Sequence, residues 1–330
     1  MIPLTQKALY EQSWQWHLKN SVTTIKDLAT KLDIEISDVP TDFPLLVPLP
    51  YLKRISPRNP SDPLLLQILP TAIENESSQG FFKDPLREIS STKGSGMIHK
   101  YYGRLLIIAT GICAVNCRYC FRRHFPYHEH QLSKDDWRDI ESYIRGDPSI
   151  REVILSGGDP LMMTDKRLKE LVLRLGELSQ LTHLRIHTRL PIVIPQRVTS
   201  GLLDWAGNDR FRTVFVIHAN HANEIDGYVG DAIEKLRSVN ITVLNQSVLL
   251  KGVNNKLETL IDLSWQLSKY GVLPYYLHLL DKVSGSVQFD IPERVAVGLV
   301  KQMTEKLPGY LVPKLVREIP DASAKVQIGA

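Results

Sequence analysis

Long apolar runs, blocks of like charge and an obvious disulfide framework are all missing from this chain of 330 residues. No apolar stretch approaches the roughly 18 residues that a membrane-spanning helix needs. Residues 1–16 are interrupted by polar side chains, unlike a cleavable signal. We therefore expect a cytoplasmic protein with no membrane partner. The 40 basic and 36 acidic residues are mixed along the sequence, so nothing indicates a nucleic-acid partner.

Cysteine is scarce, and its few copies are clustered. The chain has only Cys113, Cys117 and Cys120. An odd, closely spaced set cannot build a disulfide framework but is natural for a metal site in a reducing compartment. The C-x3-C-x2-C spacing suits a [4Fe–4S] cluster with one iron left without a protein ligand, where a small molecule can bind.

Two other interpretations of the cysteines stay open at this point. Zinc usually takes four ligands in structural sites, and His124, His128 and His130 lie close enough in the sequence to compete as ligands. The cysteines could also be buried, inert side chains, because free cysteine packs as a small hydrophobe.

Changes in proline content and in hydrophobic patterning divide the chain into three segments. Residues 1–95 are rich in proline and show a helix-like pattern from Trp14 to Leu32, so we expect a mostly helical N-terminal extension. Residues 96–290 alternate short β-branched runs with amphipathic stretches, which predicts an α/β fold with a parallel sheet, either open or closed into a barrel. Residues 291–330 form a short C-terminal extension. The expected strands cover residues 105–109, 152–155, 184–187, 213–217, 242–248 and 275–279, and the expected helices 165–178, 224–237 and 257–268.

Chemically useful side chains recur where these strands end. In parallel α/β folds the carboxyl ends of the strands carry the chemistry. Here they are followed by Cys113, by the turn Gly157-Gly158-Asp159, by Arg189, by His218 and by Asp281, and Gln246 lies within the end of the fifth strand.

The cysteine spacing with an aromatic residue before the last cysteine (Tyr119) resembles the signature of radical S-adenosylmethionine (SAM) enzymes. The Gly157-Gly158 pair after the second strand resembles their second motif. This resemblance implies a partial (β/α)6 barrel, a cluster on the three cysteines, and SAM bound to its open iron. The residues implied in SAM binding are Tyr119, Ser156, Gly157, Gly158, Asp159, His218 and Gln246.

From about Lys100 to Lys325 the chain is similar to one subfamily, the lysine 2,3-aminomutases. Matching segments include residues 117–123, 184–191, 218–221, 245–254 and 274–276. The resemblance implies pyridoxal 5′-phosphate (PLP) as a further cofactor, bound as a Schiff base by Lys325; Lys282 is a lesser competitor. A Schiff-base lysine must be partly desolvated, so we expect the tail to fold back over the barrel mouth.

The same resemblance assigns the remaining site residues. Lys100, Tyr101 and Arg104 take the positions of PLP-phosphate contacts. Arg122 takes that of the arginine that binds the α-carboxylate of the substrate, L-lysine, a task that suits a planar bidentate donor. Asp281 matches an aspartate that receives the substrate's ε-ammonium, and Glu318 replaces a second such aspartate.

Among lysine 2,3-aminomutases, the chain resembles the compact group that makes (R)-β-lysine for the modification of elongation factor P (EF-P). This implies an external reductant, a functional partnership with the synthetase-like enzyme that attaches the β-lysine, and a possible homo-oligomer. The alternatives are a free-lysine 2,3-aminomutase, a non-catalytic iron–sulfur protein and a zinc-based hydrolase.

Overall fold

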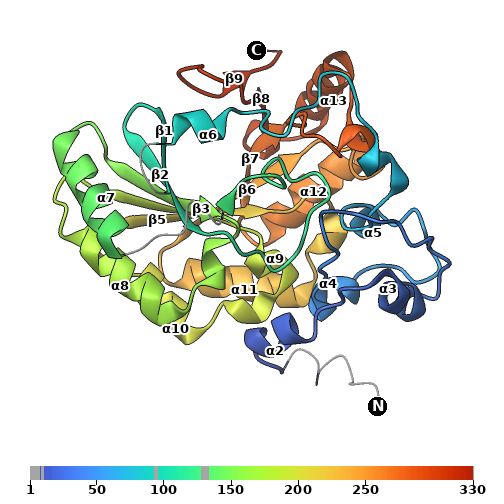
Figure 1. Cartoon of the computed structure of the whole chain (residues 1–330), viewed down its shortest axis with the longest axis horizontal. Coiled ribbons are helices and arrows are strands. Elements are labelled where there is room, and N and C mark those ends of the chain that lie inside the picture. Colours follow the sequence, from blue (N-terminus) through green and yellow to red (C-terminus); the bar gives the residue numbers. More distant parts are fainter. Residues whose placement is uncertain (1–7, 9–10, 93–95, 128–133, 330) are drawn as a thin grey trace.

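A computed structural model describes residues 8, 11–92, 96–127 and 134–329 (Figure 1). In this part of the chain one nine-stranded sheet has a spatial order that follows the sequence. Strands β2 to β8 run parallel, and β1 and β9 are antiparallel additions at the two ends. The strands are β1 Met97–Tyr101, β2 Arg104–Thr110, β3 Glu152–Gly157, β4 His183–Thr188, β5 Arg212–His218, β6 Thr242–Val248, β7 Leu273–His278, β8 Lys314–Arg317 and β9 Val326–Gln327.

The longer helices lie along the outside of the curved sheet, as Figure 1 shows. Helix α8 illustrates why they form. The Thr164 side chain accepts from a backbone N–H of the first turn, and Leu168, Leu171 and Leu175 recur at helical spacing on its buried face. The helices after β2 are α7 Lys134–Gly146, α8 Asp165–Gly176, α9 Leu190–Val193, α10 Ser200–Ala206, α11 Gly227–Ser238, α12 Leu257–Lys269 and α13 Glu293–Lys306.

The described N-terminal part consists of short helices joined by irregular, proline-containing stretches. The helix-like pattern from Trp14 to Leu32 resolves into two helices, α2 and α3, and Val22 between them pairs with Val47. The helices are α2 Trp14–Lys19, α3 Ile25–Leu32, α4 Leu49–Leu52, α5 Pro63–Leu66 and α6 Glu88–Ser91. Single 3-10 turns occur at η1 Ala72–Asn75, η3 Pro160–Met162, η4 Pro195–Arg197, η5 Ala222–Glu224, η6 Val287–Phe289 and η7 Gly309–Leu311.

The α/β prediction is confirmed, because parallel strands alternate with helices along the chain. The sheet is a partial barrel, since β1 and β9 stand at opposite ends of the strand order. The six expected strands are β2 to β7, and the three expected helices are α8, α11 and α12. Strand β8, a parallel strand of four residues, was not among the six expected strands. The division of the chain at residues 95 and 290 stays a prediction. No helix in the described part of the chain combines the length and apolarity needed to cross a membrane.

Candidate active site

A cavity of about 320 Å³ opens at the carboxyl ends of the parallel strands. Every site residue named from the sequence lines it, although those residues come from positions 100 to 325. They are Lys100, Tyr101, Arg104, Cys113, Cys117, Tyr119, Cys120, Arg122, Ser156, Gly157, Gly158, Asp159, His218, Gln246, Asp281, Glu318 and Lys325. The fold therefore brings the residues expected to bind the cluster, SAM, PLP and substrate into one space, while their individual roles stay predictions.

The three cysteines lie on the loop between β2 and α7, and all are unpaired thiols. Burial raises the pKa of Cys113 well above its ordinary value and that of Cys120 to about 11. The thiolates therefore need a strongly positive partner, such as iron, to form at neutral pH. Within the described residues, no three His, Cys, Asp or Glu side chains are grouped to hold one metal ion. A cubane cluster does not require such a group, because each thiolate binds a different iron.

The histidines considered as zinc ligands do not strengthen that alternative. The His124 ring nitrogen Nε2 lies 3.2 Å from the carbonyl of Ser284, and the residue is not part of the cavity lining. His128 and His130 lie outside the described residues.

The glycine pair is fixed by its packing against the cysteine loop. Gly157 has φ +121°, and a Cβ on Gly158 would overlap the carbonyl of Ile112. The backbone N–H of Gly158 donates to Thr110 at 2.7 Å. A side chain at either glycine would thus push the cysteine loop away from the end of β3.

Asp159 joins the ends of two strands. Its carboxylate accepts from the Thr188 hydroxyl at 2.7 Å and from the backbone N–H groups of Arg189, Leu190 and Leu161. Burial raises the pKa of Asp159, and these hydrogen bonds oppose that rise. Its carboxylate thus serves the scaffold, and a contact with SAM stays a prediction.

Arg122 already has an anionic partner that the sequence analysis missed. Its Nε and Nη2 donate to the two oxygens of Glu88 at 2.6 and 2.9 Å, and its Nη1 donates to Ser156 Oγ at 3.0 Å. Burial alone would raise the pKa of Glu88, but Arg122 and then Lys100 outweigh it and lower that pKa. Glu88 comes from α6 in the N-terminal part, where a lone glutamate in a polar stretch carries no recognisable signal.

The predicted substrate-ammonium site and the predicted PLP lysine are neighbours. Glu318 forms an ion pair with Lys325 and accepts from Lys100 at 3.2 Å. Burial would raise the pKa of Glu318, but the two lysines lower it to about 2. Burial and then the Glu318 charge raise the pKa of Asp281 to about 7. The competing Lys282 lies outside the cavity lining and pairs with Asp290 at 3.0 Å.

The expected return of the tail is present. Strand β9 pairs antiparallel with β8. Lys325, directly before β9, lines the cavity with 21% of its side chain exposed. Near this end, Arg104 Nε, His187 Nε2 and His278 Nε2 are buried without a hydrogen-bond partner. Burial lowers the pKa of His278 to about 3, so its imidazole is neutral. Unpaired buried polar atoms cost free energy, so this end of the cavity fits a polar cofactor such as PLP.

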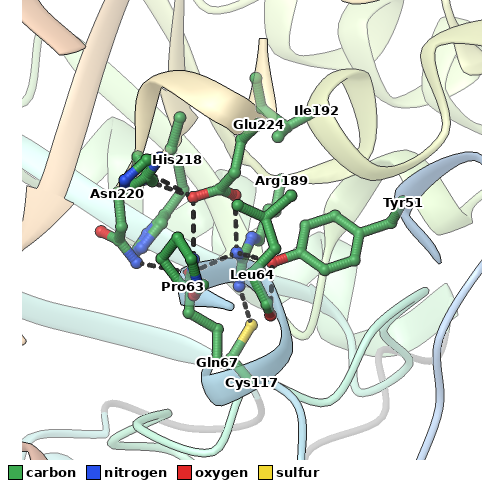
Figure 2. A network of polar contacts seen from close by, with 12 residues as sticks. Tyr51, Pro63, Leu64, Gln67, Cys117, Arg189, Ile192, His218, Asn220 and Glu224 are labelled. Carbon is green, nitrogen blue, oxygen red and sulfur yellow. Dashed lines mark hydrogen bonds and ion pairs between the residues drawn. The ribbon is translucent and has the colours of Figure 1, made fainter. Parts of the chain in front are cut away.

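A buried polar network connects the cysteine loop to the N-terminal part (Figure 2). The Tyr119 hydroxyl lies 3.1 Å from His218 Nε2, and Arg189 donates to that hydroxyl at 2.7 Å. Gln246 lies beside His218 in the paired strands β5 and β6. The sequence analysis placed Arg189 after the third strand but gave it no role. Gln67 and Glu224 were not predicted; both pair with Arg189, which lies 122 and 35 residues away from them, respectively.

Comparisons with known proteins agree with this geometry. A family model described as the radical SAM superfamily matches residues 107–197. The chain is 47% identical over 315 residues to an L-lysine 2,3-aminomutase of Haemophilus influenzae, covering 94% of this chain and 93% of that protein. It is 42% identical over 324 residues to one of Escherichia coli, with coverages of 96% and 94%. It is 31% identical over 328 residues to one of Clostridium subterminale, with coverages of 96% and 77%.

The matches to these relatives span nearly the whole chain, including the cysteine loop and the glycine pair. Radical SAM superfamily membership implies a [4Fe–4S] cluster and SAM as cofactors. The chain therefore belongs to the L-lysine 2,3-aminomutase family of radical SAM enzymes and is an isomerase.

Proposed function

We propose that this enzyme converts (S)-α-lysine to (R)-β-lysine with PLP as a third cofactor, and that the product is used to modify EF-P. The observation that carries the proposal is that Lys325 lines the same cavity as Cys113, Cys117 and Cys120. When bound, the cluster and SAM would supply hydrogen-atom abstraction, and PLP would carry the migrating amino group.

The charges in the cavity suit an amino acid that is cationic at its far end. Arg122 would hold the α-carboxylate of lysine, with Glu88 on the Nε edge of the guanidinium fixing its plane. Asp281 and Glu318 would face the ε-ammonium. Because the pKa of Asp281 is about 7 without substrate, an arriving ammonium would favour its ionised form.

The remaining residues would orient the groups and exclude water. Lys325 would bind PLP, and Lys100, Tyr101 and Arg104 would hold its phosphate, since all four line one end of the cavity. The Gly157-Gly158 pair, His218 and Gln246 would contact SAM beside the cysteine loop. Closing reactive groups in a small, mostly buried cavity protects them from side reactions.

The use of the product for EF-P rests on the resemblance to the compact group of the family. The two relatives that are 47% and 42% identical are of similar length, because the chain covers 93% and 94% of them. The relative that is 31% identical is longer, and the chain covers 77% of it. Glu318 in place of an aspartate also fits that group. We propose the synthetase-like EF-P-modifying enzyme as functional partner and the cytoplasm as location, since the three thiols are unpaired.

The PLP assignment is tested by absorbance. PLP bound to the protein as a Schiff base absorbs near 420 nm, where an iron–sulfur cluster also absorbs, so Lys325→Ala should abolish this band in PLP-loaded protein prepared without the cluster. The control is Lys282→Ala, which removes the other candidate lysine and should leave the band unchanged. Holoenzyme that carries a cluster but never PLP would refute the proposal.

The product is tested by chirality. Anaerobic incubation with SAM, PLP, a reductant and L-lysine should yield (R)-β-lysine on chiral chromatography. Formation of (S)-β-lysine, or faster turnover of another amino acid, would favour a free amino acid mutase outside EF-P modification.

A further inference from the structure

We propose that Arg189 sets the reduction potential of the cluster by donating a hydrogen bond to the sulfur of Cys117. The inference rests on the assignment of Cys117 as a cluster ligand. It gives a role in electron entry to an arginine that makes none of the substrate or cofactor contacts proposed above.

Both terminal nitrogens of Arg189 have hydrogen-bond partners, whereas its buried Nε has none among the described residues. The residue follows β4, and its side chain is only 8% exposed. Nη1 donates to Cys117 Sγ, and Nη2 donates to Gln67 Oε1 at 2.7 Å and Glu224 Oε2 at 2.8 Å. Figure 2 shows the guanidinium between the cysteine sulfur on one side and the Glu224 carboxylate on the other.

Glu224 holds the guanidinium in this place. Its other oxygen accepts from the backbone N–H groups of Asn220 and His221 at 2.8 and 3.1 Å and from Gln67 Nε2 at 3.1 Å. The carboxylate is completely buried. Because both of its oxygens are occupied, Glu224 fixes the guanidinium against the cysteine sulfur.

The choice of acceptor distinguishes Arg189 from an arginine that only supports the fold. A neutral cysteine sulfur is a weak acceptor, whereas an anionic thiolate on iron is a strong one. Arg197 provides the contrast, because its side chain is also completely buried but donates to the carbonyls of Leu161 and Met163 and pairs with Asp165.

The sign of the effect follows from charge. One-electron reduction adds a negative charge to the cluster, and a nearby guanidinium in a dry environment stabilises the reduced form more than the oxidised form. Arg189 should therefore raise the reduction potential, so that a given external reductant reduces a larger fraction of the cluster. The buried anion of Glu224, lying behind the guanidinium, should lower it.

The test is a redox titration of the reconstituted full-length protein without SAM, using dithionite and mediators and following the reduced cluster by electron paramagnetic resonance. In Arg189→Met the ratio of reduced to oxidised cluster at a fixed poise should fall about tenfold, which is about 59 mV for a one-electron couple. Arg189→Lys should recover part of this loss. Arg197→Met is the matched control and should keep the wild-type potential.

A second variant covers the case in which Arg189→Met fails to assemble a cluster. Glu224→Gln keeps the shape and removes only the charge, so its potential should move in the opposite direction, upward. With full iron content, an unchanged potential in Arg189→Met, or in Glu224→Gln where Arg189→Met holds no cluster, would overturn the inference alone. Wild-type protein that never holds a cluster would overturn the proposed function with it.

Discussion

At the scale of single residues, the cavity places carboxyl groups where only some of them can be charged. Glu318 stays ionised because Lys325 and Lys100 face it, and its charge adds to burial in raising the pKa of Asp281 to about 7. In the unfolded chain Asp281 would titrate near 4. Between these values the folded state binds more protons than the unfolded state, so the contribution of Asp281 to stability is lost as pH rises from about 4 to about 7.

Asp281→Asn should therefore separate stability from function. At pH 8 the cofactor-free variant should melt at least about 2 °C above the wild type, because a buried charge is removed, and at pH 4 the two should differ little. Its KM for lysine should rise at least tenfold, since the ammonium loses its anionic partner. Calorimetry and initial rates measure both.

The matched control is Asp204→Asn, which alters an exposed aspartate paired with Lys169 and should change neither quantity. In the wild-type enzyme the KM for lysine should fall as pH rises through about 7, because Asp281 then ionises. A KM that stays constant between pH 6 and 8 would argue against this assignment.

Some residues of this cavity could be predicted from the sequence, and others could not. Arg122 and Lys325 could be proposed because the resemblance to the aminomutase family aligns them with functional positions. Glu88 could not be predicted, because it lies 34 residues from Arg122 in the sequence and only the fold brings its Oε2 to 2.6 Å from Arg122 Nε. His187 and His278 were also missed, because a histidine in a strand usually has only a structural role.

At the scale of elements, the joint between the cysteine loop and the end of β3 positions the cluster ligands. Two of the backbone hydrogen bonds between them run from Gly158 N–H to the Thr110 carbonyl at 2.7 Å and from Asp159 N–H to the Ile112 carbonyl at 2.8 Å. The glycines let the two backbones approach this closely.

Gly158→Ala should force these backbones apart. We expect a loss of about 1–3 kcal/mol of stability, typical of overpacking, together with reduced iron content after reconstitution. Urea unfolding and iron analysis measure the two effects.

Gly298→Ala is the comparison variant. Gly298 lies in α13, and a Cβ there would meet no atom within 4 Å, so this change should stabilise the protein by about 0.5–1 kcal/mol. Wild-type iron content and stability in Gly158→Ala would contradict this account of the glycine pair.

At the scale of the whole molecule, the N-terminal part is joined to the barrel through buried ion pairs. Glu74, from η1, accepts from Arg118 Nε at 2.9 Å and from Arg123 Nη2 at 2.8 Å. Both arginines belong to the cysteine loop, and the side chain of Arg118 is completely buried. A second junction is the exposed ion pair between Arg87, directly before α6, and Asp321, between β8 and β9.

Glu74→Ala should destabilise the protein by about 3–5 kcal/mol, because it leaves Arg118 and Arg123 buried without their anionic partner. Equilibrium unfolding in urea measures the loss, and the iron content should fall with it. The exposed Glu76, two residues away, gives the control Glu76→Ala, which should stay within about 0.5 kcal/mol. Equal effects of the two substitutions would show that the ion pairs do not hold the two parts together.

The sequence by itself determined the alternation of strands and helices and the approximate position of every residue that the motifs name. It could do so because strand and helix periods, cysteine spacing and the glycine pair are local properties of the chain. Only the tertiary structure decided that Glu88 pairs with Arg122 and that Arg189 connects Cys117 to Glu224. These pairings depend on burial and on contacts between distant segments, and charge, hydrogen bonding and pKa values follow from those contacts rather than from the order of residues.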